Sequence, residues 1–229
     1  MHRHEKRAAP TAAQRMIRTL GVLLAGGRGE RLGAPVAKAH VRVAGRTLLA
    51  RAMDALAPVS DRVVVAVPRA FEWPDSSPPP PSVTLAHDVL DDEGPLAGLV
   101  GALRAPGHDE AERVVLLGVD FPLMSASVLR ALLAEAAYAP APALLPAPGG
   151  IPQPLVAIYS RAAGEALCAA FDAGERSLVA SALALGARVL DDAALERLGI
   201  REALAFNLNT PRDLAEAEQR LAAAREHDA

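Results

Sequence analysis

Short, almost continuously apolar runs alternate along this chain with segments whose apolar residues recur at helical spacing. The apolar runs are predicted to be strands, at residues 19–25, 62–67, 83–87, 113–119 and 155–159. Strands that are apolar at nearly every position are typical of sheets covered on both faces. The segments with helical spacing are 47–57, 96–103, 125–137, 161–173 and 177–185. This alternation predicts an α/β fold, a three-layer αβα Rossmann-like sandwich around a mostly parallel central sheet.

The ends of the chain and its proline-rich segments define the domain organisation. A last helix is predicted to begin at Thr210-Pro211-Arg212-Asp213, which offers an N-cap hydroxyl, a proline at the first helical position and an acid in the first turn. The proline-rich segments 74–81 and 139–154 are predicted to be loops, and the second is placed to rim a site. We expect residues 1–18 to be a disordered tail and residues 19–229 to form a single domain.

Composition narrows the class of protein further. The 229 residues are 51% hydrophobic and 22% charged, with a formal net charge of −3, which argues against disorder and against a nucleic-acid-binding role. No apolar run approaches the roughly 20 residues of a membrane helix, and the basic N-terminus lacks the apolar core of a secretory signal. The only cysteine, Cys168, excludes an internal disulfide and a cysteine-rich zinc site. We therefore expect a cytoplasmic protein without membrane partners.

A glycine-rich loop with basic residues follows the first predicted strand. Its sequence, LLAGGRGERLG at residues 23–33, lets the backbone bring its amides against a phosphate, and Arg28, Arg31 and Lys38 add positive charge. It is not a P-loop, because Gly33 is followed by alanine, and the dinucleotide fingerprint would need glycine where Leu32 stands. A plain strand–loop connection with solvated arginines is the alternative interpretation.

Asp120 follows the apolar run that ends at residue 119. Ligands of open α/β sheets bind beyond the carboxyl ends of the strands, and a lone carboxylate there suits Mg²⁺, which takes one or two protein oxygens together with substrate phosphates. The alternative is a turn or helix-capping aspartate just before Ser125.

These motifs together resemble a known family. The glycine loop is similar to the signature loop of nucleotidyltransferases with the nucleotide-diphospho-sugar transferase-like fold. Four later segments resemble the molybdenum cofactor guanylyltransferases in order and approximate spacing, and the resemblance covers residues 19 to 220. The segments are GPLAGL at 94–99, VDFPL at 119–123, QPLVAIY at 153–159 and FNLNTPRDL at 206–214.

The resemblance implies a function and a set of site residues. It implies transfer of GMP from GTP to the terminal phosphate of molybdopterin, with Mg²⁺ held by Asp120 and with Lys38 and Arg31 as further catalytic residues. The implied partners are GTP, a molybdopterin-type acceptor and other proteins of the molybdenum cofactor pathway. The implied nucleotide-binding residues are Leu24, Ala25, Gly26, Gly27, Gly29, Lys38, Asp88 and Gly98. The implied acceptor-binding residues are Gln153, Asn207 and Asn209, with the separate roles of the two asparagines left open.

Three departures from the family pattern keep other functions open. Gly118 stands where the family often has a cysteine. Ala66 stands where the guanylyltransferases commonly have an asparagine that contacts nucleotide. Arg31 and Lys38 are seven residues apart, as in sugar-phosphate and terpenoid-pathway cytidylyltransferases, where the guanylyltransferases have six. A cytidylyl- or uridylyltransferase acting on another small acceptor, and a catalytically degenerate family member that binds a cofactor, are therefore the alternatives.

Overall fold

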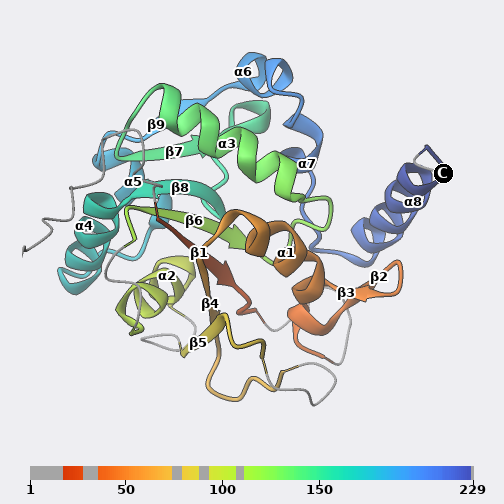
Figure 1. Cartoon of the computed structure of the whole chain (residues 1–229), viewed down its shortest axis with the longest axis horizontal. Coiled ribbons are helices and arrows are strands. Elements are labelled where there is room, and N and C mark those ends of the chain that lie inside the picture. Colours follow the sequence, from red (N-terminus) through yellow and green to blue (C-terminus); the bar gives the residue numbers. More distant parts are fainter. Residues whose placement is uncertain (1–17, 28–35, 74–78, 88–92, 107–110, 228–229) are drawn as a thin grey trace, which may run out of the picture.

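The computed structural model describes residues 18–27, 36–73, 79–87, 93–106 and 111–227, and its centre is a seven-stranded sheet in the order β5-β4-β1-β6-β8-β7-β9 (Figure 1). Strand β8 is antiparallel to both of its neighbours, and the other six strands run parallel. The strands are β1 (Thr19–Leu24), β4 (Arg62–Val67), β5 (Val83–His87), β6 (Arg113–Gly118), β7 (Ala143–Pro146), β8 (Val156–Ser160) and β9 (Arg188–Leu190). A separate hairpin joins β2 (Arg42–Val43) to β3 (Arg46–Thr47).

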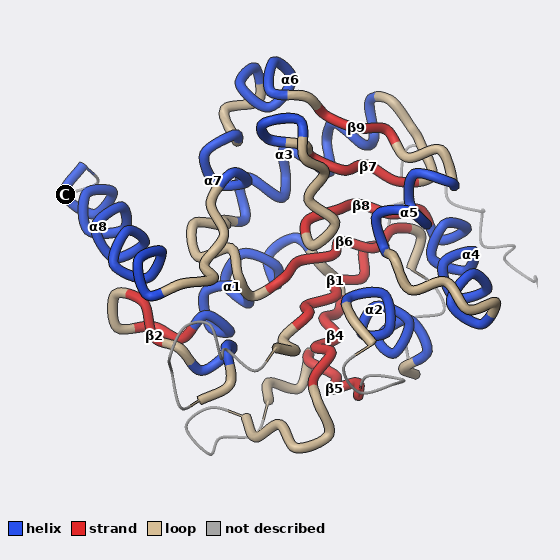
Figure 2. Tube along the Cα trace, turned by 180° about the vertical axis from the view of Figure 1, so that it is seen from behind, coloured by secondary structure: helices blue, strands red, loops and turns tan. Residues whose placement is uncertain are grey.

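Helices cover both faces of the sheet. Helices α1 and α3 lie on one face, and Figure 2 shows α2, α4 and α5 on the other. The helices are α1 (Leu48–Leu56), α2 (Pro95–Arg104), α3 (Ala126–Tyr138), α4 (Arg161–Asp172), α5 (Leu178–Ala184), α6 (Asp192–Arg197), α7 (Arg201–Ala205) and α8 (Pro211–His227). The predicted three-layer α/β fold with a mostly parallel sheet is confirmed.

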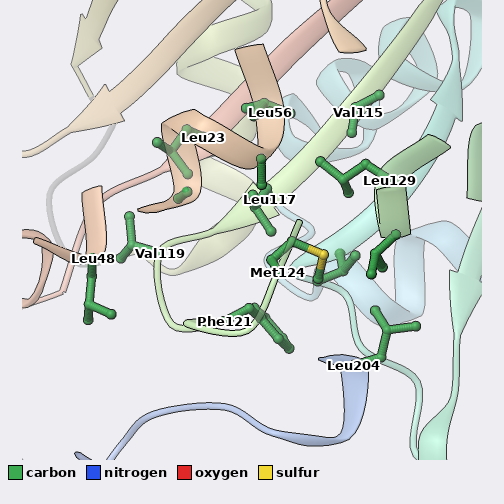
Figure 3. Packing of buried hydrophobic residues seen from close by; sticks show 14 of the residues in the cluster. Leu23, Leu48, Leu56, Val115, Leu117, Val119, Phe121, Met124, Leu129 and Leu204 are labelled. Carbon is green, nitrogen blue, oxygen red and sulfur yellow. The ribbon is translucent and has the colours of Figure 1, made fainter. Parts of the chain in front are cut away.

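Two buried clusters form the core because successive strand residues face opposite sides of the sheet. In β1, Leu20, Val22 and Leu24 pack under α2, α4 and α5, whereas Leu23 packs under α1 and α3. The second cluster is seen at close range in Figure 3, where Leu23, Leu56 and Leu117 converge. Because the sheet is shared, each buried strand contributes to both clusters.

Side-chain caps fix where several helices begin. The Thr47 hydroxyl accepts a hydrogen bond from the Ala50 amide (3.1 Å), and Ser160 caps α4 in the same way. At α8, the Asp213 carboxylate accepts hydrogen bonds from the amides of Asn209 (2.9 Å) and Thr210 (2.7 Å), and Thr210 Oγ1 accepts one from the Asp213 amide (3.2 Å). This capping box confirms the predicted start of the last helix.

The prediction of one loop over residues 139–154 is wrong, because Ala143–Pro146 forms the fully buried strand β7. Its three apolar residues before Pro146 are too few to show a period, and pairing with β8 and β9 makes them a strand. Strand β9, helices α6 and α7 and the β2–β3 hairpin were not expected either, and each is short. The predicted disordered tail lies outside the described residues except for Arg18, and so does much of the first proline-rich segment. No helix in the described part of the chain is long and apolar enough to cross a membrane.

Candidate active site

An open cleft of about 660 Å³ lies at the carboxyl ends of β1, β4 and β6, beside the N-terminus of α2. Parallel neighbouring strands place their carboxyl ends at one edge of the sheet, which is where ligands of open α/β folds bind. Its described lining consists of Leu24, Gly26, Gly27, Lys38, Ala66, Pro68, Arg69, Ala70, Gly94, Pro95, Gly98, Gly118, Val119, Asp120 and Leu155. Most of these side chains are small, so backbone forms much of the wall.

Three polar side chains from distant parts of the chain meet at the β6 side of the cleft. The Lys38 ammonium donates a hydrogen bond to Asn209 Oδ1 at 2.8 Å and lies 3.9 Å from Asp120 Oδ2. Lys38 begins the short 3₁₀ helix η3 (Lys38–His40) after the glycine loop, and Asp120 lies in the turn after β6. The Leu208 amide donates to the Asp120 carbonyl at 2.7 Å, which brings Asn209 beside this turn.

The Asp120 carboxylate is buried, and one of its oxygens lacks a hydrogen-bond partner among the described residues. Asp120 is 7% exposed, and its Oδ1 has no hydrogen-bond partner within the described residues. Burial raises the pKa of Asp120, and the nearby Lys38 ammonium opposes this rise. An oxygen that is buried without a partner is costly, so this carboxylate is suited to a ligand or cation that enters the cleft.

The glycine loop meets the cleft through Leu24, Gly26 and Gly27. Gly27 has φ of 119°, a conformation that favours glycine, and its carbonyl accepts a hydrogen bond from the Lys38 amide at 3.3 Å. The Ala25 amide donates to the Ala66 carbonyl at 2.9 Å, so this N–H is already used within the sheet edge. The loop residues Arg28, Gly29 and Arg31 lie outside the described residues.

Of the remaining predicted site residues, some line the cleft and others do not. Gly98 lines the cleft from the first turns of α2, and Asp88 lies outside the described residues. Gln153 and Asn207 are partly buried, and neither belongs to the described lining of the cleft. The Gln153 amide donates to the Pro146 carbonyl at 2.8 Å, in the loop that leads to Leu155. Of the three predicted acceptor-side residues, the structure thus brings Asn209 into contact with Lys38.

Comparison with known proteins identifies the family. A family model for the MobA-like NTP transferase domain matches residues 21–189. The chain belongs to this family. A "Probable molybdenum cofactor guanylyltransferase" of Chloroflexus aggregans is 32% identical over 85% of this chain and 90% of its own length. A molybdenum cofactor guanylyltransferase of Cereibacter sphaeroides is 31% identical over 90% of this chain and 98% of its own length.

A solved structure supports the fold of this MobA-like chain. The molybdopterin-guanine dinucleotide biosynthesis protein A of Archaeoglobus fulgidus superposes with a TM-score of 0.68, covering 89% of this chain and 98% of that one at 24% identity. Identity at this level is evidence for the fold alone. The family and the guanylyltransferase relatives support a nucleotidyltransferase of the MobA-like type.

The structure adds cleft residues that the sequence did not single out. Pro68, Arg69 and Ala70 directly follow β4. The available signal was their position after the carboxyl end of a predicted strand, where the fold class places ligands. A single arginine in such a segment carries no spacing pattern, so the sequence alone did not separate it from other surface arginines.

The cleft of this MobA-like protein is suited to a polyanion. Lys38, Arg69 and the loop amides offer positive charge and donors, and Asp120 offers one carboxylate. No group of three or more His, Cys, Asp and Glu side chains in the described ranges can hold a metal ion. A lone buried carboxylate fits Mg²⁺ that is shared with substrate phosphates, because Mg²⁺ keeps most of its ligands from water and phosphate.

Proposed function

We propose that this chain transfers GMP from GTP to the terminal phosphate of molybdopterin and releases pyrophosphate. The observation that carries the proposal is that Lys38 and Asp120 line one cleft at the carboxyl ends of β1 and β6, and that Asn209 contacts Lys38 there. The named activity of the relatives in this family supports the choice of GTP and of a molybdopterin acceptor. We also propose that the protein works in the cytoplasm.

The reaction needs alignment and charge compensation rather than a general base. An oxygen of the acceptor phosphate, already ionised at neutral pH, forms a bond to the α-phosphorus of GTP as the bond to the β-phosphate oxygen breaks. Negative charge then accumulates on the pyrophosphate that leaves. In this proposal, Lys38 and the amides of Gly26 and Gly27 hold the triphosphate. Arg31, outside the described residues, is proposed to act on the leaving group.

Asp120 is the residue proposed to hold Mg²⁺. Its Oδ1, which has no hydrogen-bond partner among the described residues, and its place in the cleft lining would suit Mg²⁺. When bound, Mg²⁺ neutralises charge on the phosphate oxygens. Asn209 positions Lys38 through its 2.8 Å hydrogen bond, so that the ammonium stays beside the carboxylate. Gln153 and Asn207 are proposed to contact the acceptor, and Ala25, Gly29, Asp88 and Gly98 are proposed to contribute to the nucleotide site.

Pyrophosphate release tests this function directly. The purified protein is supplied with molybdopterin, Mg²⁺ and either GTP, ATP, CTP or UTP, and we expect turnover with GTP that disappears when the metal is chelated. Asp120→Asn should lower turnover at least about 100-fold, as loss of a group that organises charge in the transition state does. The matched control is Asp54→Asn, which removes an exposed carboxylate paired with Arg46 and should leave turnover unchanged.

Ala66 is the observation that favours a second candidate. It lines the cleft with a methyl group where the guanylyltransferases commonly carry an amide, so a cytidylyl- or uridylyltransferase of the same fold remains the alternative. Turnover with CTP or UTP in place of GTP would replace the proposed substrate by this one. Nucleotide binding without pyrophosphate release from any of the four would instead support the degenerate, cofactor-binding family member.

A further inference from the structure

On the β4 side of the cleft, Arg69 is the one residue of the described lining whose side chain can form directed hydrogen bonds. Among the described lining residues, only Lys38, Arg69 and Asp120 carry charged or polar side chains, and the others are glycine, alanine, proline, leucine or valine. Lys38 and Asp120 lie together on the β6 side, where the proposed function places the phosphates. A nucleobase that extends from there towards β4 and α2 therefore meets Arg69.

Arg69 lies in a turn that is held by a hydrogen bond within it and by contacts of the residues that follow it. The Phe71 amide donates to the Pro68 carbonyl at 3.0 Å, which closes the turn directly after β4. The Phe71 ring stacks on the His40 ring with centroids 5.1 Å apart, and His40 Nε2 lies 2.9 Å from the Glu72 carbonyl oxygen. Because His40 belongs to the same 3₁₀ helix as Lys38, these contacts tie the segment that carries Arg69 to the segment that carries Lys38.

Two residues of this wall are prolines. Pro68 and Pro95 have no N–H group, so neither can donate a hydrogen bond to a ligand. Guanine presents two neighbouring acceptors, O6 and N7, whereas adenine presents an amino group in place of O6. An arginine fork matches the guanine pair with two parallel hydrogen bonds and opposes the adenine amino group, donor against donor.

We propose that Arg69 is the residue that selects the base: its guanidinium donates two hydrogen bonds, to O6 and N7 of guanine, across the small-residue wall formed by Ala66, Ala70 and Gly98. This assignment rests on the proposed function, because it takes GTP as the nucleotide. It also explains how the cleft could recognise a base although Ala66 has no side-chain amide. In this proposal, Arg69 supplies the directed hydrogen bonds from the turn that follows β4.

The test is calorimetric binding of GTP, ATP and 7-deaza-GTP, each with Mg²⁺, to the wild type and to Arg69→Ala. A bidentate arginine–guanine contact corresponds to about 5- to 150-fold discrimination, so the GTP-over-ATP preference should fall by that factor in the variant. The wild type should also bind 7-deaza-GTP, which lacks the N7 acceptor, more weakly than GTP. Arg69→Ala should bind these two nucleotides equally.

Two further variants make the outcome specific. Arg69→Lys keeps the positive charge but loses the planar fork, so its GTP-over-ATP preference should be weaker than that of the wild type while its affinity for the triphosphate is kept. Arg62→Ala removes an exposed arginine from the opposite end of the same strand and should change nothing. Thermal melting confirms that each variant is folded.

The possible failures are distinguishable. A wild type without GTP preference would overturn the proposed function and this assignment together. A clear GTP preference that survives in Arg69→Ala would overturn the assignment alone. An equal loss of GTP and ATP affinity in Arg69→Ala would also overturn it, because that pattern is expected of a residue that binds phosphate.

Discussion

At the scale of single residues, Asp120 combines two opposing electrostatic effects. Its burial raises the pKa of the carboxyl group, and the Lys38 ammonium at 3.9 Å opposes that rise without cancelling it. Lys38 is itself held by Asn209, so the cation remains in place when Asp120 changes its charge. The folded protein therefore carries a carboxylate that costs stability when ionised, as is common where binding of a ligand or metal repays the cost.

The Asp120→Asn variant should reveal this cost as a pH-dependent gain in stability. The pKa of Asp120 is raised in the folded protein, so above the ordinary carboxyl value of 3.8 the folded state binds more protons than the unfolded chain. The free energy of unfolding therefore falls as the pH rises from 3.8 through the raised pKa. Asparagine does not titrate. In thermal melts without nucleotide or metal, the Tm of the variant relative to wild type should rise between about pH 4 and pH 8.

The exposed Asp54, paired with Arg46, provides the control for this prediction. Asp54→Asn should give a Tm difference from wild type that stays small at every pH, since exposed ion pairs contribute little. A Tm difference between Asp120→Asn and wild type that falls between about pH 4 and pH 8 would mean that the balance between burial and Lys38 has the opposite sign.

At the scale of elements, the end of β6 and the loop before β8 approach each other closely at Gly118. The Gly118 amide donates to the Leu155 carbonyl at 2.7 Å. A Cβ added at Gly118 would lie 2.5 Å from Asp120 Oδ1 and 3.1 Å from Leu155 Cβ. Gly118→Ala should therefore displace the carboxylate and lower kcat for pyrophosphate release by about 100-fold, the usual effect of misplacing a catalytic group by about 1 Å.

Gly164→Ala is the matched control for this substitution. Gly164 lies within α4, away from the cleft, and its added Cβ would make an ordinary contact of 3.5 Å with Leu103 Cδ1. We expect unchanged turnover, and melting shows whether each variant is folded. Full turnover in Gly118→Ala would mean that Asp120 does not need the position it has in this structure.

The elements also show which parts of the fold the sequence predicted. The five predicted strands and six predicted helices are present with small shifts of their ends, because almost continuously apolar runs and helical spacing determine them locally. Strands β7 and β9 were missed because runs of three or four residues become strands only through their neighbours in the sheet. The reversal of β8 likewise depends on the path of the chain, which apolar periodicity does not encode.

At the scale of the whole molecule, a segment that follows the residues of the family match contacts a residue that lines the cleft. That match ends at residue 189, whereas Leu208 is fully buried and Asn209 contacts Lys38 across 171 residues of sequence. The motifs in the sequence identified Lys38 and Asn209 as site candidates, but only the folded chain shows that they contact each other. Arg69 was missed because its proposed role depends on the small side chains that surround it in the cleft, and only the folded chain brings these together.

The shared sheet leads to a prediction for the whole chain, that it unfolds as a single domain. Trp73, the only tryptophan, packs against the cluster under α1 and α3, and Cys168, the only cysteine, packs against the cluster under α2, α4 and α5. Because β1 and β4 supply side chains to both clusters, loss of one should remove the support of the other. Tryptophan fluorescence and pulsed labelling of the thiol in increasing urea should therefore give the same midpoint, since coincident transitions are the mark of cooperative unfolding. Separate midpoints would divide the chain into two independently stable units, with the boundary running through the sheet that holds Asp120.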